Sequence, residues 1–564
     1  MKIFNLNSKI IGLILIVIIY LSTSPAKPLD KFAEADRVSD YFSGILLLNE
    51  NKYEESFNFL KKLNGLETNH LDYSKKYLFS LINSENLKEA FNYSKKLEKQ
   101  KLDSFESHLI MGIFYLKDNQ MDLAQKYFSK AKNRNSRSVL NKYVSNSLFN
   151  WSNLKNLDLN QALLELEKID GRFENLKKIQ KVFLSCYFED QNSKNLFKKL
   201  ISDEKIDFSR YNYFYASYLN FLGKKHDAQD IVDLSLNSYP RNLLLNQYKL
   251  DLDKNNDISI FEFNNERHVV AEILYITANA LSAQSIYPLS NFYLNLSKYL
   301  NEDFHSYDTL LAENYYKSKN FKSAKKIYKK LNKRGKAYRW YSSKQLAKIL
   351  IKEKKKNEAL KLVSEAYNDL VDKDIYEIYD YAEFLKNNEK FKESIPLYSK
   401  IINQVEKNHP LYVEATDGRG VAFERVDEWK KAEKDLLSSL EADPDQAYVI
   451  NYLAYSWIEK GIKIEKSLKM LEKANKLRSN DPYITDSLGW ALFKLERYQE
   501  AKKYLQLAVR LMPGDPIVND HYGDVLWKNG NKIQARYYWN YVLNLEKTED
   551  KLKKIIENKL IKGL

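Results

Sequence analysis

The sequence predicts an all-α protein in which helical hairpins stack on one another as an α-solenoid. The first observation is composition, because only 15 of the 564 residues are Gly and 10 are Pro, less than half the usual share of each. Loops and β-hairpins need these residues for their special backbone angles, so the chain should consist mostly of helix. The second observation is a spacing of small and apolar residues that returns every 34 residues. A period of this length is typical of stacked hairpins.

Composition also limits what the protein can be. With 44% hydrophobic residues, the chain has enough apolar surface to fold, which excludes disorder. The formal charge of +15 is spread along the chain and indicates a solvated, Lys-rich helical surface. The same charge would also suit acidic partners or an anionic membrane surface. A single cysteine, Cys186, excludes an internal disulfide and a cysteine-based zinc site.

The N-terminal residues have the order of parts of a secretory signal peptide. Lys2 and Lys9 give a positive start, residues 10–21 are apolar, and small residues follow at 24–26. The apolar run is shorter than the roughly 18 residues of a membrane-spanning helix. We therefore expect residues 1–26 to be removed and the protein to be periplasmic. The alternative is a retained inner-membrane anchor.

The repeating pattern is clearest around Gly112. From this anchor, Tyr115 follows at +3, Ala124 at +12, Phe128 at +16 and Ala131 at +19. Residues three apart share a helix face, so the anchor and its +3 partner lie on a first helix. The small residue at +12 opens a second helix where the two backbones approach most closely. The pattern therefore predicts a helical hairpin.

Small or apolar anchors of this kind recur along nearly the whole chain. The anchors are Gly44, Leu78, Gly112, Ala216, Ala278, Ala312, Ala347, Ala382, Gly420, Ala454, Gly489 and Gly523. This register resembles the tetratricopeptide repeat (TPR), a family of stacked helical hairpins. The resemblance implies about 12–14 repeats in one or two arrays.

The register also suggests how the chain is divided. We expect a degenerate N-terminal array over residues 27–250 and a C-terminal array over 268–545. Residues 251–267 are polar and lack the pattern, which indicates a linker between the arrays. Residues 546–564 should form a helix that caps the last repeat. Its apolar stripe consists of Leu552, Ile555, Ile556 and Leu560.

No pattern for catalysis or for a cofactor stands out. The seven histidines are well separated, no Gly-rich phosphate loop is present, and nothing suggests nucleic-acid binding. One alternative is a calcium loop over residues 251–262, with Asn256 where such loops usually have Gly. Its oxygen ligands would be Asp251, Asp253, Asn255, Asp257 and Glu262. The other interpretation of residues 251–262 is a polar linker. For the chain as a whole, we predict no metal, no cofactor and no enzyme activity.

The first helices of such hairpins line the inner surface of the stack, where solenoids bind partners. The residues three before and one or four after each anchor point inward. For the last three repeats, the predicted protein-binding residues are Asn451, Tyr455, Asp486, Trp490, Asp520, Asp524 and Trp527. Aromatic rings beside carboxylates suit apolar anchors and a cationic or amide-bearing chain. The alternative is that Trp490 and Trp527 pack between repeats.

The C-terminal third sharpens the family resemblance. The segments NYLAYSWIEKG and DPYITDSLGWALFKLERYQEAKKYLQLAVRLMPGDP are similar to the end of large exported proteobacterial TPR proteins. Some of those are outer-membrane lipoproteins that act as protease adaptors, and this chain departs from them in lacking the lipidated cysteine. The resemblance implies a periplasmic scaffold that binds envelope proteins and presents substrates to a processing protease. The alternative is a scaffold for cell-wall or exopolysaccharide assembly.

Overall fold

The computed structural model describes residues 31–134, 138–254, 260–370 and 372–564. The predicted signal peptide lies outside these residues. Across them the secondary structure is helical, with α2 to α31 and three short 3-10 helices and no strand. No helix in this part of the chain is both long and apolar enough to cross a membrane. The all-α prediction is confirmed.

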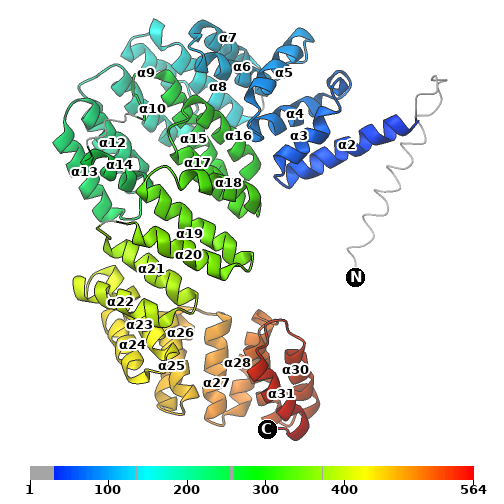
Figure 1. Cartoon of the computed structure of the whole chain (residues 1–564), viewed down its shortest axis with the longest axis vertical. Coiled ribbons are helices and arrows are strands. Elements are labelled where there is room, and N and C mark those ends of the chain that lie inside the picture. The colour runs from blue at the N-terminus through cyan, green and yellow to red at the C-terminus, as the bar shows by residue number, and fades with distance from the viewer. Residues whose placement is uncertain (1–30, 135–137, 255–259, 371) are drawn as a thin grey trace. The chain divides into compact units, whose positions relative to one another are not determined.

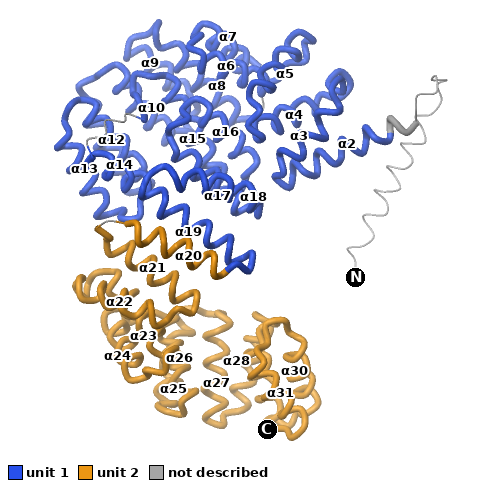
Figure 2. Tube along the Cα trace, in the orientation of Figure 1, with its two compact units in different colours: residues 1–355 blue, residues 356–564 orange. Residues whose placement is uncertain are grey.

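The chain forms two compact units, which meet in sequence between Lys355 and Lys356 (Figure 2). Unit 1 contains α2 (Lys31–Asn49), α3 (Tyr53–Lys61), α4 (Leu71–Asn83), α5 (Leu87–Lys99), α6 (Phe105–Lys117), α7 (Met121–Asn133), α8 (Val139–Ser152), α9 (Leu159–Glu167), α10 (Glu174–Tyr187), α11 (Ser193–Ile201), α12 (Arg210–Phe221), α13 (Lys225–Ser238), α14 (Leu243–Asp253), α15 (Glu266–Ala283), α16 (Tyr287–Leu300), α17 (Ser306–Lys317), α18 (Phe321–Leu331) and α19 (Lys336–Lys352).

Unit 2 contains α20 (Lys356–Asn368), α21 (Ile375–Asn387), α22 (Phe391–Gln404), α23 (Pro410–Arg425), α24 (Trp429–Ala442), α25 (Ala447–Glu459), α26 (Ile464–Leu477), α27 (Pro482–Lys494), α28 (Tyr498–Leu511), α29 (Pro516–Lys528), α30 (Lys532–Leu543) and α31 (Asp550–Lys562). From α21 to α30, successive helices pair as hairpins that stack in chain order (Figure 1).

The glycine anchors lie on first helices and hold the second helices close. A Cβ added at Gly112 would stand 2.3 Å from Cε1 of Phe128, and one at Gly489 would stand 2.7 Å from Leu505 Cγ. Real Cβ atoms do not approach that closely, so only glycine lets the bulky +16 side chain reach the first helix. The helix-packing role predicted for these glycines is confirmed.

In unit 1 the hairpin α15–α16 packs against the first helices of the preceding hairpins. Helix α16 contacts α4 and α6, and α15 contacts α8 and α10. Phe292 of α16 stacks on Phe79 of α4 with ring centroids 5.4 Å apart. Tyr187 of α10 donates a hydrogen bond of 2.7 Å to Glu266 at the start of α15. The inner surface of the first hairpins is therefore occupied by a later part of the same unit.

An ion pair between a largely buried Arg210 and a fully buried Glu272 ties α12 to α15. The Arg210 guanidinium donates to both carboxylate oxygens of Glu272, at 2.7 and 2.9 Å. It also donates to Ser306 Oγ at 2.6 Å and lies 3.8 Å from the ring centroid of Tyr275. Glu272 is completely buried, so its charge depends on these contacts rather than on water.

The position of the unit boundary differs from the one expected at residues 251–267, which lie inside unit 1. Phe261 and Phe263 in this stretch are buried against Phe183 of α10 and Phe214 of α12. The physical reason is that two aromatic rings in an otherwise polar segment anchor it to the core. Two of the possible calcium ligands, Asn255 and Asp257, lie outside the described residues. Asp251 and Asp253 belong to the last turn of α14.

Helix α31 packs on α30 at the end of unit 2. Ile556 is fully buried in the core of the last hairpins, with Leu552 and Leu560 packed against the same core. Ile555, expected in the same stripe, is 44% exposed. One residue is a turn of 100° on a helix, so Ile555 and its neighbour Ile556 cannot face the core equally.

Candidate protein-binding surfaces

The seven residues predicted to bind a partner lie on α25, α27 and α29, the first helices of the last three hairpins. The side chains differ in exposure. Asn451, Tyr455 and Trp527 are half-buried. The remaining four are buried, namely Asp486, Trp490, Asp520 and Asp524. Most of the predicted set is therefore already packed within the chain.

Trp490 and Asp486 are both held by His521 of the next first helix. The imidazole stacks on the Trp490 ring with centroids 3.9 Å apart and planes 11° apart. Its Nδ1 lies 2.9 Å from Asp486 Oδ2. Burial disfavours the imidazolium, but the Asp486 carboxylate, together with those of Asp520 and Asp524, outweighs burial and raises the pKa of His521 above its ordinary value. Trp490 Nε1 donates to Glu459 at 2.8 Å, so this indole packs between repeats.

Asp520 and Asp524 are neutralised by Lys559 of α31. Its ammonium lies 2.6 Å from Asp520 Oδ1 and 2.8 Å from both oxygens of Asp524. Asp524 also accepts a hydrogen bond of 3.0 Å from Trp539 Nε1. Burial, and then the Asp520 carboxylate, raise the pKa of Asp524 to about 6 although Lys559 opposes the rise. This pair of carboxylates is suited to binding a cation, and Lys559 of the same chain already occupies that position.

Trp527 is covered in part by the C-terminal residues. A Cβ at Gly563 would stand 2.1 Å from Trp527 Cζ2, which places the backbone of Gly563 against the ring. The Arg536 guanidinium lies 5.0 Å from the ring centroid. Asn451 and Tyr455 thus offer the accessible part of the predicted set. Partner binding by these seven residues stays a prediction.

The sequence analysis missed an exposed apolar stripe on α30. Ile533, Tyr537 and Tyr541 are 86%, 67% and 38% exposed. They are spaced four residues apart, so they form a continuous stripe on one face of the helix. Scattered exposed apolar residues are ordinary, but a contiguous stripe marks an interaction surface.

The stripe differs from the same positions of two other second helices, α18 and α24. It occupies positions +10, +14 and +18 from the anchor Gly523. In α18 the same positions are all exposed lysines, and in α24 they are two exposed lysines and a half-buried serine. Those residues are Lys322, Lys326 and Lys330 in α18, and Lys430, Lys434 and Ser438 in α24.

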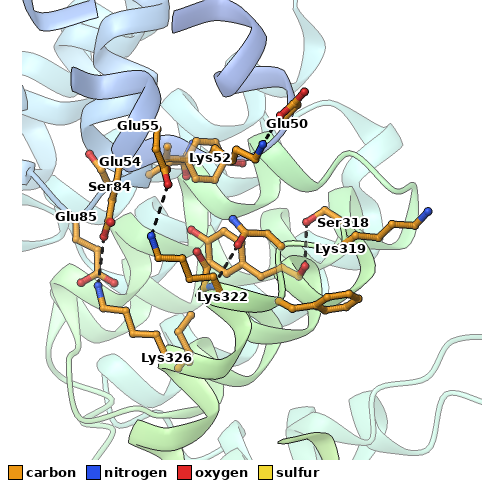
Figure 3. Close-up of a pocket in the computed structure, with 17 residues that line it drawn as sticks. Glu50, Lys52, Glu54, Glu55, Ser84, Glu85, Ser318, Lys319, Lys322 and Lys326 are labelled. Atoms are coloured by element: carbon orange, nitrogen blue, oxygen red, sulfur yellow. Dashed lines mark hydrogen bonds and ion pairs between the residues drawn. The ribbon is translucent and has the colours of Figure 1, made fainter. Parts of the chain in front are cut away.

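A separate cleft in unit 1 lies between the start of α3 and helix α18 and has a volume of 490 Å³ (Figure 3). Ion pairs cross it, with Lys326 Nζ 3.5 Å from Glu54 and Lys322 Nζ 3.6 Å from Glu55. Asn320 Nδ2 donates to the carbonyl of Asn51 at 2.8 Å. These contacts hold the first hairpin against α18. The lysines on one side of the cleft are therefore paired with glutamates on the other side.

Among the residues that the structure describes, no three His, Cys, Asp or Glu side chains come together in a group that could hold a metal ion.

Comparison with known proteins points to one family. Residues 301–548 match the family model described as tetratricopeptide repeat. The curated TPR repeat-containing protein PA4667 of Pseudomonas aeruginosa is 28% identical over 154 residues, which are 27% of this chain. The match covers 25% of that relative, so this chain spans about a quarter of its length.

Solved structures match shorter parts of the chain. MamA from Desulfovibrio magneticus RS-1 is 17% identical, with a TM-score of 0.27, over 31% of this chain and 97% of its own. YrrB, described as a TPR protein with an unusual peptide-binding site, is 16% identical, with a TM-score of 0.27, over 33% of this chain and 92% of its own.

Proposed function

We propose that this chain, whose residues 301–548 match the tetratricopeptide repeat family model, is a non-catalytic scaffold that binds protein partners in the periplasm. Repeats of this kind build protein–protein interaction scaffolds. The signal-peptide pattern of residues 1–26 supports export. Within the envelope, the scaffold would act as an adaptor that presents substrate proteins to a processing protease.

The observation that carries this proposal is the apolar stripe on α30. Ile533, Tyr537 and Tyr541 expose apolar surface at positions that are three lysines in α18 and two lysines and a serine in α24. Large aromatic side chains are the usual anchors of protein interfaces. The same helix exposes the cations Lys532 and Arg536. The surface therefore suits a partner segment whose apolar side chains are flanked by carboxylates.

Crosslinking capture from the intact envelope tests the proposal. The wild-type chain is compared with Ile533→Ser/Tyr537→Ser, which removes the stripe without touching the core. A matched control is Leu234→Ser on α13, because Leu234 is 67% exposed in unit 1. We expect the α30 variant to lose a specific partner that the control retains.

Substituting the buried indole Trp490 would be a poor test, because it would disturb packing between repeats. A second variant, Asn451→Ala/Tyr455→Ala, examines the accessible part of the inner face instead. Loss of the partner only in this variant would move the binding surface from α30 to the inner face. Identical partners in all variants would refute binding through either surface.

A further inference from the structure

The first helix of unit 1 carries an apolar stripe that nothing in the described chain covers. On α2, Val38, Phe42 and Leu46 are 56%, 65% and 60% exposed and stand four residues apart. The opposite side of α2 packs on α3, where Gly44 makes close contact with Leu60. Helix α2 lies at the edge of unit 1 beside α3 (Figure 1). The stripe is therefore the outward face of the first hairpin.

Interior hairpins show what this face normally does. Phe42 and Leu46 lie two residues before and two after the anchor Gly44. At the equivalent positions of α27, which are Ser487 and Ala491, the side chains are buried. His521 and Val525 of α29 are also buried, and His521 is stacked on the preceding first helix. At Phe42 and Leu46 the stripe on α2 is thus a stacking face without a preceding helix, whereas the positions equivalent to Val38 are exposed in α27 and α29.

At the C-terminal end of the chain, the outward face of the last hairpin is covered. Helix α31 covers the last hairpin and buries Ile556 there. In the processed form proposed above, only the four residues 27–30 precede α2. The stripe itself spans about 12 Å of helix.

The stripe is complementary to itself. If two α2 helices pack antiparallel about a two-fold axis through Phe42, Val38 of one copy faces Leu46 of the other. The two Phe42 rings meet at the axis. Ala35 and Ser39 lie on the same exposed side, and their small side chains permit close approach of the two helices. An isologous contact of this kind closes at two copies.

We propose that α2 is a homodimer interface, in which Val38, Phe42 and Leu46 pack against the same residues of a second copy of this chain. The proposal rests on the processing of residues 1–26 proposed above. Because one helix from each copy makes the contact, the interface belongs to the small, reversible class. We therefore expect dissociation in the micromolar range, roughly 1–100 μM.

Sedimentation equilibrium of residues 27–564, across concentrations spanning that range, tests the proposal. We expect a monomer–dimer equilibrium for the wild type and at least tenfold weaker association for Phe42→Lys. Leu234→Lys is the matched control and should associate like the wild type, because Leu234 is as exposed as Phe42 but lies on α13. Circular dichroism checks that both variants are folded.

A cysteine variant tests the two-fold geometry. Phe42→Cys places two thiols at the axis, so oxidation should give a disulfide-linked dimer, whereas Leu234→Cys should not. The natural Cys186 is buried and leaves little background. A wild type that is monomeric throughout, or a Phe42→Lys variant that associates unchanged, would overturn the proposal. Open-ended oligomers would overturn the two-fold pairing. Because the test needs neither export nor a partner, its failure is separate from failure of the scaffold function.

Discussion

The buried pair of Arg210 and Glu272 gives the sharpest test of how unit 1 is held together. Glu272→Gln keeps the size of the side chain but removes its charge. Arg210 then keeps only neutral acceptors, among them Ser306, with little of its side chain open to solvent. A buried charge that loses its partner is not compensated by water. The variant should therefore destabilise unit 1.

The size of the effect follows from the burial of the pair. Breaking a buried ion pair by removing one partner costs about 3–5 kcal/mol. Unit 1 has roughly 320 described residues, and unfolding entropy near 2.1 cal/mol/K per residue gives about 0.7 kcal/mol per degree. The Tm of unit 1 should thus fall by about 4–7 °C. In the double variant Arg210→Met/Glu272→Leu, apolar side chains replace both charges, and most of the loss should be recovered.

Scanning calorimetry measures the shift, and hydrogen exchange locates it. Amides of α12, α15 and α17 should exchange faster in Glu272→Gln, while those of unit 2 serve as an internal reference. Glu302→Gln is the control, because Glu302 pairs with Lys117 at the surface and exposed pairs contribute about 0–1 kcal/mol. A loss below about 1 kcal/mol in Glu272→Gln, or a double variant no more stable than the single one, would refute the reasoning.

Three further predictions concern packing and charge. Gly112→Ala should cost about 1–3 kcal/mol in denaturant unfolding through overpacking, whereas Gly514→Ala, with open space around its added Cβ, should be nearly neutral; equal effects would contradict the close-approach role. Lys559→Met should destabilise unit 2 more at pH 8 than at pH 5. The pKa of Asp524 in the folded protein is about 6, so the carboxylate that loses its cation is charged only at the higher pH; urea unfolding at both pH values decides this. Asp486→Asn should lower the pKa of its histidine partner, measured by the titration of the imidazole proton resonances. The stability linked to that raised pKa, present below about pH 6.5 and lost as pH rises through the folded value, should disappear; an unchanged titration would exclude the carboxylate as the cause.

Local patterns predicted the hairpins well, because their causes lie within one repeat. A small side chain such as Gly489 fixes where two helices approach, and its spacing to Leu505 is visible in the sequence. The aromatic anchoring of residues 251–267 was missed, because burial of Phe261 depends on helices distant in the chain. The inner-face positions on first helices were predicted. That Lys559 neutralises the carboxylates there was not, since pairing between α29 and α31 has no periodic signal.

The packing of α15–α16 inside unit 1 has a consequence for folding. In an open solenoid each repeat touches only its neighbours, so folding can begin anywhere and spread. In unit 1, by contrast, hydrogen bonds connect Asn295 with Asn83 and Asn320 with Asn51. Each pair is separated by more than 200 residues of chain. Closing such long loops costs entropy before the contacts form, which slows folding. A growing chain therefore cannot complete unit 1 until about residue 320 is available for folding, so we expect truncations before that point to leave the first hairpins unstable.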